Sequence, residues 1–154
     1  MKKIFLLLFS TLSILFAQET TARVVYDLTT KNMENFEHKI LKAIVANKAH
    51  YEGLLKELDV VVIIHGEAYK FFLKNPKTSI YKEDKPLIEN YKTLAKRIDS
   101  MVQNYDVEFL MCGAGMTKRE IKKRDVYKFV NIIPNATIGL IDKQNDGYAY
   151  IPVK

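Results

Sequence analysis

Tryptophan is absent from the sequence, and cysteine occurs only once, as Cys112. A lone cysteine excludes an intramolecular disulfide and the paired-cysteine motifs of structural zinc sites. The three histidines are scattered along the chain without the spacing of a metal motif, so we expect no metal and no cofactor. Only four prolines and six glycines are present, without an internal repeat or a low-complexity segment, which is the composition of an ordinary globular protein.

Long blocks of charge of one sign are also absent. Lysine and arginine number 24 and aspartate and glutamate 18, which gives a formal net charge of +6. Residues 118–124 are the densest basic cluster, but acidic residues interrupt and follow it, as is typical of a solvated helix face. We therefore expect no nucleic-acid partner. With 48% hydrophobic and 27% charged residues, the chain suits one globular domain, which we place at residues 23–154.

The N-terminal segment has the pattern of an export signal. Two lysines precede an apolar run at residues 4–16, and Ala17 offers a small residue for cleavage. This predicts a signal peptide over residues 1–17, a periplasmic or secreted location, and no membrane attachment after cleavage. Cleavage after Ala22 is a second option, and an uncleaved anchor is disfavoured because the run is short for a membrane span. Removal of residues 1–17 takes away two lysines and no acidic residue, so the net charge falls from +6 to +4.

Strand patterns alternate with helix patterns along the rest of the chain. In the expected strand at residues 59–64, the five residues after Asp59 are apolar without interruption, which indicates burial on both faces, as in a parallel sheet covered by helices. Alternation of this kind predicts an α/β fold with a mostly parallel sheet and helices on both faces. Strands are expected at 23–28, 59–64, 107–112, 129–133 and 148–151, and helices at 32–55, 67–73, 84–102, from 117 onward and 136–144.

The stretch around Cys112 combines a strand, a thiol and a glycine turn. Residues 107–111 are apolar apart from Glu108, with β-branched and aromatic members, which predicts a buried strand that ends at Cys112. Gly113 and Gly115 follow, and glycines so close together let the backbone turn sharply and approach a ligand. The same glycines could form a nest of backbone N–H groups for a small anion.

A helix-start signal follows the glycine turn. Thr117 and Glu120 have the spacing of a capping box, and Met116 and Ile121 have the spacing of a hydrophobic staple. We therefore expect a helix to begin at Thr117. A thiol just before a helix N-terminus lies near the positive end of the helix dipole and near free N–H groups, which favour the thiolate.

Four polar or reactive residues each close an expected strand: Asp27, His65, Cys112 and Asn135. In a parallel α/β sheet the ligand site lies beyond the carboxyl ends of the strands. We therefore expect these side chains to share one edge of the sheet. Gly66 follows His65 directly and belongs to the same candidate site.

The segments that end these strands resemble the DsrE/DsrF-like family, and most closely its small stand-alone branch, in which one cysteine ends a central strand. The resemblance covers the chain from Arg23 onward, in the order 24–27, 62–66, 107–112, 133–135 and 147–151. It implies a three-layer α/β/α fold with a five-stranded, mostly parallel sheet, commonly assembled into trimers or hexamers. It also implies that Cys112, the matching position, carries persulfide sulfur, as in the better-known sulfur-relay branches.

Three functions remain open for this site. In the first, Cys112 is a persulfide or thiol carrier of sulfurtransferase type, and His65 orients it or exchanges a proton with it. A protein or a small sulfur compound would then be the donor or acceptor. In the second, Gly113, Gly115, Gly66, Asp27 and Asn135 bind a small anion or thiol compound without catalysis. In the third, the protein is a structural oligomer, Cys112 is buried and idle, and His65 only satisfies loop backbone.

Overall fold

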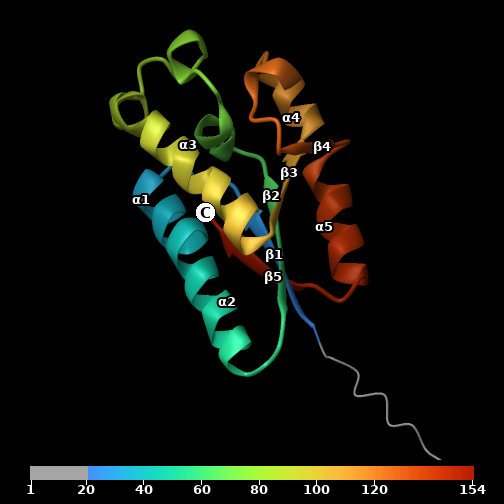
Figure 1. The fold of residues 1–154 in the computed structure, drawn as a ribbon. Coiled ribbons are helices and arrows are strands. Elements are labelled where there is room, and N and C mark those ends of the chain that lie inside the picture. The colour runs from blue at the N-terminus through green and yellow to red at the C-terminus, as the bar shows by residue number, and fades with distance from the viewer. Residues whose placement is uncertain (1–20) are drawn as a thin grey trace, which may run out of the picture.

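A computed structural model describes residues 21–154, so the expected signal peptide at 1–17 lies outside the described residues. Five strands form one sheet in the order β4-β3-β2-β1-β5, and every neighbouring pair is parallel (Figure 1). The strands are β1 (Ala22–Leu28), β2 (Leu58–Ile64), β3 (Val107–Cys112), β4 (Asn131–Ile133) and β5 (Ala149–Val153). The helices are α1 (Met33–Phe36), η1 (Glu37–Lys42), α2 (Ala43–Gly53), η2 (Ala68–Phe72), η3 (Pro76–Thr78), α3 (Lys85–Tyr105), α4 (Gly113–Lys118), η4 (Lys123–Asp125) and α5 (Ala136–Asn145). The expected α/β fold with a five-stranded sheet is confirmed.

Helices cover both faces of this sheet. Figure 1 shows α1, α2 and α3 on one side and α5 on the other, with α4 beyond the end of β3. The strand order explains this, because the chain steps from β1 to β4 in one direction and then returns to the far side of β1, so its right-handed crossovers use opposite faces. We call the two faces the α3 face and the α5 face.

The α5 face can be identified from close packing at Gly139 of α5. A Cβ at this position would lie 3.1 Å from Cδ1 of Ile63 and 2.5 Å from Cδ1 of Ile133. Ile63 pairs with Asp27 of β1 and with Leu110 of β3, so these three side chains form one rung of the α5 face. Asp27 therefore points toward the α5 side.

The α3 face carries an aromatic core. Phe36 of α1 stacks on Phe71 of η2 with ring centroids 4.5 Å apart, and Phe72 contacts both Phe36 and Phe109 of β3. These rings are fully buried. The expected long helix at 32–55 is interrupted by the π-helical segment η1, whose wider turn keeps Ile40 facing the core.

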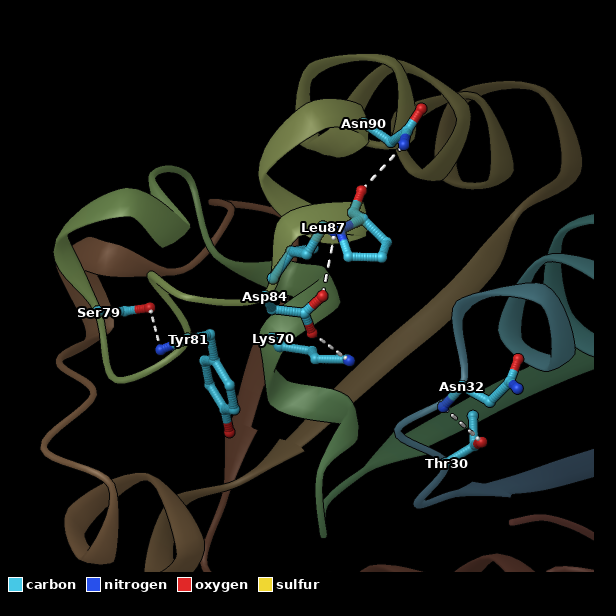
Figure 2. Close-up of polar contacts among 9 residues, drawn as sticks. Thr30, Asn32, Lys70, Ser79, Tyr81, Asp84, Leu87 and Asn90 are labelled. Carbon is cyan, nitrogen blue, oxygen red and sulfur yellow. Dashed lines mark hydrogen bonds and ion pairs between the residues drawn. The ribbon is translucent and has the colours of Figure 1, made fainter.

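Helix α3 begins at a capped and ion-paired aspartate. Oδ1 of Asp84 accepts a hydrogen bond from the backbone N–H of Leu87, and Oδ2 lies 2.5 Å from Nζ of Lys70 (Figure 2). Pro86 occupies the first turn, where its missing N–H is tolerated. The start expected at Asp84 is therefore confirmed.

The prediction that a helix begins at Thr117 is wrong. Helix α4 begins immediately after Cys112, and Thr117 lies near its end, where Oγ1 donates to the Gly113 carbonyl at 3.3 Å. Glu120 has φ +55°, its N–H donates to the Thr117 carbonyl, and the N–H of Ile121 donates to the Met116 carbonyl. This is a Schellman motif, so the apolar pair Met116 and Ile121 closes the end of a helix rather than opening one.

The last strand also differs from the expected one. Pro152 lies within β5 and pairs with Asp27, although we expected proline to end the strand. Because β5 is at an edge of the sheet, its outer side needs no donor, and a proline is tolerated there.

Candidate functional site

Asp27 and His65 meet at the carboxyl edge of the sheet. Nε2 of His65 lies 2.5 Å from Oδ1 of Asp27. The N–H of His65 donates to the Leu28 carbonyl at 3.0 Å, so the β1–β2 ladder continues one residue past β2 and fixes the start of the histidine loop. The expectation that strand-ending residues converge holds for this pair.

Tyr150 of β5 joins the pair from the other side. Its hydroxyl donates to Oδ2 of Asp27 at 2.6 Å. The Asp27 residue is 8% exposed, so its two carboxylate oxygens have little contact with water and each has one protein partner. The hydrogen bond to Asp27 is the main reason why the pKa of Tyr150 is raised, and this keeps the phenol protonated.

Cys112 lies on the same face of the next strand. It follows Leu110 by two residues, as His65 follows Ile63, and Ile63 and Leu110 pair directly. Alternation along a strand therefore places the Cys112 and His65 side chains on the α5 face of adjoining strands. Cys112 is 7% exposed. Among the described residues, the hydrogen bond from the His65 ring goes to Asp27 and not to Cys112.

The Cys112 thiolate is surrounded by hydrogen-bond donors. Burial raises the pKa of the thiol, but the N–H of Gly115, the hydroxyl of Tyr69 and the N–H groups of Ala136 and Ala114 lower it. The net effect is a pKa below the ordinary value. The lowered pKa agrees with the expectation that a strand-to-helix turn favours the thiolate.

Two of these donors are shared with other acceptors. Tyr69 donates to the Cys112 carbonyl at 2.7 Å, and Ala114 donates to the Pro134 carbonyl at 3.1 Å. A phenol has one proton, so it cannot serve the carbonyl and the thiolate at once. The N–H groups of Gly115 and Ala136, in the first turns of α4 and α5, are therefore the main donors to the sulfur.

The remaining candidate residues act through the backbone. A Cβ at Gly113 would lie 3.1 Å from the Ile133 carbonyl oxygen, and a Cβ at Gly115 would overlap the Tyr69 hydroxyl. Gly66 has φ +62°, and a Cβ there would lie 3.1 Å from the Thr29 carbonyl oxygen. Gly66 therefore shapes the histidine loop, whereas Gly113 and Gly115 allow α4 to start at the sulfur.

Asn135 is placed at the expected edge, but its side chain is already used. Its Oδ1 accepts a hydrogen bond at 2.9 Å from the N–H of Ile138 and caps α5. The cap holds the next residue, Ala136, with its N–H toward Cys112. Asn135 thus acts on the sulfur through the helix that it starts.

Sequence reasoning missed Tyr69 and the role of Tyr150. Tyr150 was expected only as a member of the strand at residues 148–151. Its contact with Asp27 depends on the β1–β5 register, in which Tyr150 pairs with Val25, and no local pattern encodes that register. Alternation of Tyr148 and Tyr150 was the available signal, and both hydroxyls do bind carboxylates, Asp59 and Asp27 respectively.

A separate hollow of about 470 Å³ lies between two loops near the end of α4. Lys74, Arg119, Lys122 and Arg124 contribute positive charge to its lining, and Glu120 and Asp125 contribute negative charge. Arg119 also contacts Glu67 at 2.8 Å and lies over the ring of Tyr69. The basic cluster is thus partly committed to ion pairs, but it spans the end of α4, a turn and η4, so the expected helix face is wrong.

Residues 21–154 also lack two other kinds of feature. No group of three or more histidine, cysteine, aspartate or glutamate side chains is arranged to hold a metal ion in this part of the chain. None of the helices described has both the length and the apolar character needed to cross a membrane.

Comparison with known proteins identifies the family. A model of the DsrE/DsrF-like family matches residues 23–153, which is nearly all of the described chain. The chain belongs to the DsrE/DsrF-like family. The resemblance drawn from the strand-end segments is confirmed.

Two individual proteins are similar to this DsrE/DsrF-like chain. An uncharacterized protein of Aquifex aeolicus (strain VF5) is 28% identical over an alignment of 107 residues, which covers 65% of this chain and 47% of that protein. The match therefore spans about half the length of the relative. Among solved structures, the protein of unknown function MTH1491 from Methanobacterium thermoautotrophicum aligns with a TM-score of 0.55 and 18% identity. The alignment covers 85% of this chain and 98% of that chain, which supports the same fold.

Proposed function

We propose that this DsrE/DsrF-like protein is an exported sulfur carrier that holds persulfide sulfur on Cys112. The observation that supports this most directly is the set of N–H donors from Gly115 and Ala136 around the thiol, with its lowered pKa. A thiolate is the nucleophilic form of cysteine, and the same donors would stabilise the negative charge of a bound persulfide.

The proposed transfer is a direct exchange between two sulfur centres. The Cys112 thiolate attacks the outer sulfur of a donor persulfide, a new S–S bond forms at Cys112, and the donor thiol leaves. The small exposed fraction of Cys112 requires a donor that presents its sulfur at the end of a narrow group. Either a small sulfur compound or a partner protein with an extended cysteine meets this requirement.

Export and assembly form part of the same proposal. The apolar run at residues 4–16 supports delivery to the periplasm or outside the cell. Large apolar side chains exposed on α5 and β5, among them Ile138 and Ile141, support a homo-oligomer, either a trimer or a hexamer.

The first test is the reactivity of Cys112 across pH. We expect a neutral alkylating reagent to label the native protein quickly, with an apparent pKa below the ordinary value of about 8.5. After incubation with polysulfide, mass spectrometry should show an added sulfur on the peptide that contains Cys112. The Cys112→Ser variant has no other thiol and serves as the blank. Slow labelling at every pH together with no sulfur adduct would exclude the carrier function.

A small-anion binding module is the second candidate, because the N–H groups of Gly115 and Ala136 both favour the negatively charged form of Cys112. Thiosulfate or sulfite would then raise the melting temperature even in Cys112→Ser. A shift seen only in the wild-type protein favours the carrier.

A further inference from the structure

Four chemically active side chains lie in a line across four adjoining strands. Tyr150 comes from β5, Asp27 from β1, His65 from the end of β2 and Cys112 from the end of β3. The hydroxyl of Tyr150 and the ring of His65 bind opposite oxygens of the Asp27 carboxylate at 2.6 and 2.5 Å. The β2–β3 register then places His65 beside Cys112 on the α5 face.

The chemistry of this line is asymmetric. At one end the Tyr150 hydroxyl is a neutral donor, and in the middle Asp27 is a buried carboxylate. A carboxylate bound to one ring nitrogen of a histidine fixes the tautomer and stabilises the imidazolium when the ring takes up a proton. The His65 side chain keeps 29% of its surface exposed, so part of the ring remains open to a substrate.

We propose that His65, held by Asp27 and Tyr150, gives its proton to the thiol that leaves when Cys112 accepts sulfur, so that the site is built for alkyl persulfides. The inference rests on the proposed carrier function and adds the identity of the general acid and the class of donor. In this role His65 contacts the substrate, whereas Asp27 and Tyr150 are positioning residues.

The atoms and charges of the step balance. The Cys112 thiolate bonds to the outer sulfur of R–S–SH, the donor S–S bond breaks, and its electron pair remains on the R–S sulfur. The His65 imidazolium supplies the proton that converts this sulfur to R–SH, and the imidazole becomes neutral. The new Cys112 persulfide can then lose its proton to the same imidazole, which restores the acid. No external oxidant or reductant is needed, because one sulfane sulfur only changes carrier.

A general acid matters only for some leaving groups. An alkyl thiol has a pKa of about 8.5 and leaves poorly as an anion, whereas an aryl thiol of low pKa leaves quickly without a proton. A His65 placed to donate a proton therefore accelerates exchange with alkyl donors and has little effect on exchange with aryl donors. A loss of rate with alkyl donors alone therefore distinguishes a general acid from a residue that only shapes the site.

The test uses disulfides as probes, because they react with Cys112 through the same exchange and leave the same thiols. Rates with one alkyl and one aryl disulfide are measured for the wild-type chain and for His65→Gln, with His38→Gln on an exposed part of η1 as the control. We expect His65→Gln to slow the alkyl probe about 100-fold, the lower range for general acid catalysis, and the aryl probe less than about threefold. His38→Gln should match the wild type with both probes.

Several outcomes would overturn the inference. Equal losses with both probes would mean that His65 only supports the structure, and unchanged rates would mean that it has no part in the transfer. Wild-type protein that reacts with neither probe would remove the carrier function itself, and the inference with it. If His65→Gln fails to fold, the rates with the alkyl and the aryl disulfide are measured for Tyr150→Phe instead.

Tyr150→Phe is a mild change, because this ring is 43% exposed and loses only the hydroxyl that binds Asp27. We expect a smaller loss, about fivefold, with the alkyl probe alone. If the variant shows no selective loss with the alkyl probe, Tyr150 is excluded as a positioning residue.

The alkyl probe is also presented on a short peptide. If His65→Gln slows only the reaction with the peptide probe, the donor is a protein. If it slows only the reaction with the free probe, the donor is a small thiol compound. If it slows neither reaction, the proposal is contradicted.

Discussion

Gly115 packs so closely against Tyr69 that a Cβ at position 115 would overlap the tyrosine hydroxyl. That hydroxyl donates to the carbonyl of Cys112, while the N–H of Gly115 lowers the pKa of the Cys112 thiol. One small residue thus allows a phenol and a backbone donor to meet at the same cysteine. A change at Gly115 disturbs both.

Gly115→Ala should lower the free energy of unfolding by about 1–3 kcal/mol, the usual range for overpacking. In a Tyr69→Phe background the loss should be about 1 kcal/mol smaller, because the overlapping oxygen is gone. Urea unfolding of the two single variants and the double variant measures this coupling. Gly53→Ala is the control, since a Cβ there has no atom within 4 Å. Strictly additive losses would contradict the proposed contact.

At the level of single residues, the sequence predicted part of the candidate site. Asp27, His65 and Cys112 were expected at one edge because each closes a strand, and the first two do bind each other. Tyr69 and Tyr150 were not expected, because their contacts join residues 43 and 123 positions apart. Such contacts depend on loop geometry and strand register, which local patterns do not encode.

Among the elements, α3 depends on a largely buried ion pair at its start. Lys70 is 9% exposed, and its Nζ lies 2.5 Å from Asp84, whose other oxygen caps the helix (Figure 2). A charge at this depth depends on its partner, because water cannot replace the partner fully.

Asp84→Asn keeps an oxygen for the cap but leaves Lys70 without an opposite charge. We expect unfolding to become about 2 kcal/mol easier, below the range for a fully buried pair because Asp84 is partly exposed. Adding Lys70→Met should recover most of the loss. Glu37→Gln breaks a more exposed pair with Arg97 and should change stability by less than about 1 kcal/mol. Thermal unfolding compares these three variants with the wild type, and equal effects of Asp84→Asn and Glu37→Gln would contradict the argument.

The sequence predicted the start of α3 well but misplaced the start of α4. Helix α3 has an apolar period over its whole length, an aspartate cap and a proline in its first turn. Helix α4 has only six residues, too few for a period to appear, and its polar and apolar pairs fit the start or the end of a helix equally. The positive φ of Glu120 decides between the two, and it is a property of the backbone.

For the whole molecule, the outer side of α5 is the surface most suited to self-association. Ile138 and Ile141 are 45% and 52% exposed and lie one turn apart on this helix. Apolar side chains grouped in this way are typical of protein interfaces.

Ile141→Lys should therefore reduce the mass measured by light scattering from that of a trimer or hexamer toward that of a monomer. Circular dichroism checks that the variant remains folded. Leu55→Lys, at an exposed turn after α2, should leave the assembly unchanged. A wild-type protein that is monomeric at micromolar concentration would rule out this assembly.

The position of β5 has a consequence for how the protein is made. Strand β1 emerges early from the ribosome, yet its outer neighbour β5 is synthesised only after all the other strands. The contact between Tyr150 and Asp27 spans 123 residues, so loop closure over this distance must precede the final pairing. The sheet therefore lacks its β5 edge until Val153 has been added. Asp27 accordingly gains its bond from Tyr150 only when this last strand joins the sheet, whereas its bond to His65 needs only the earlier strands β1 and β2.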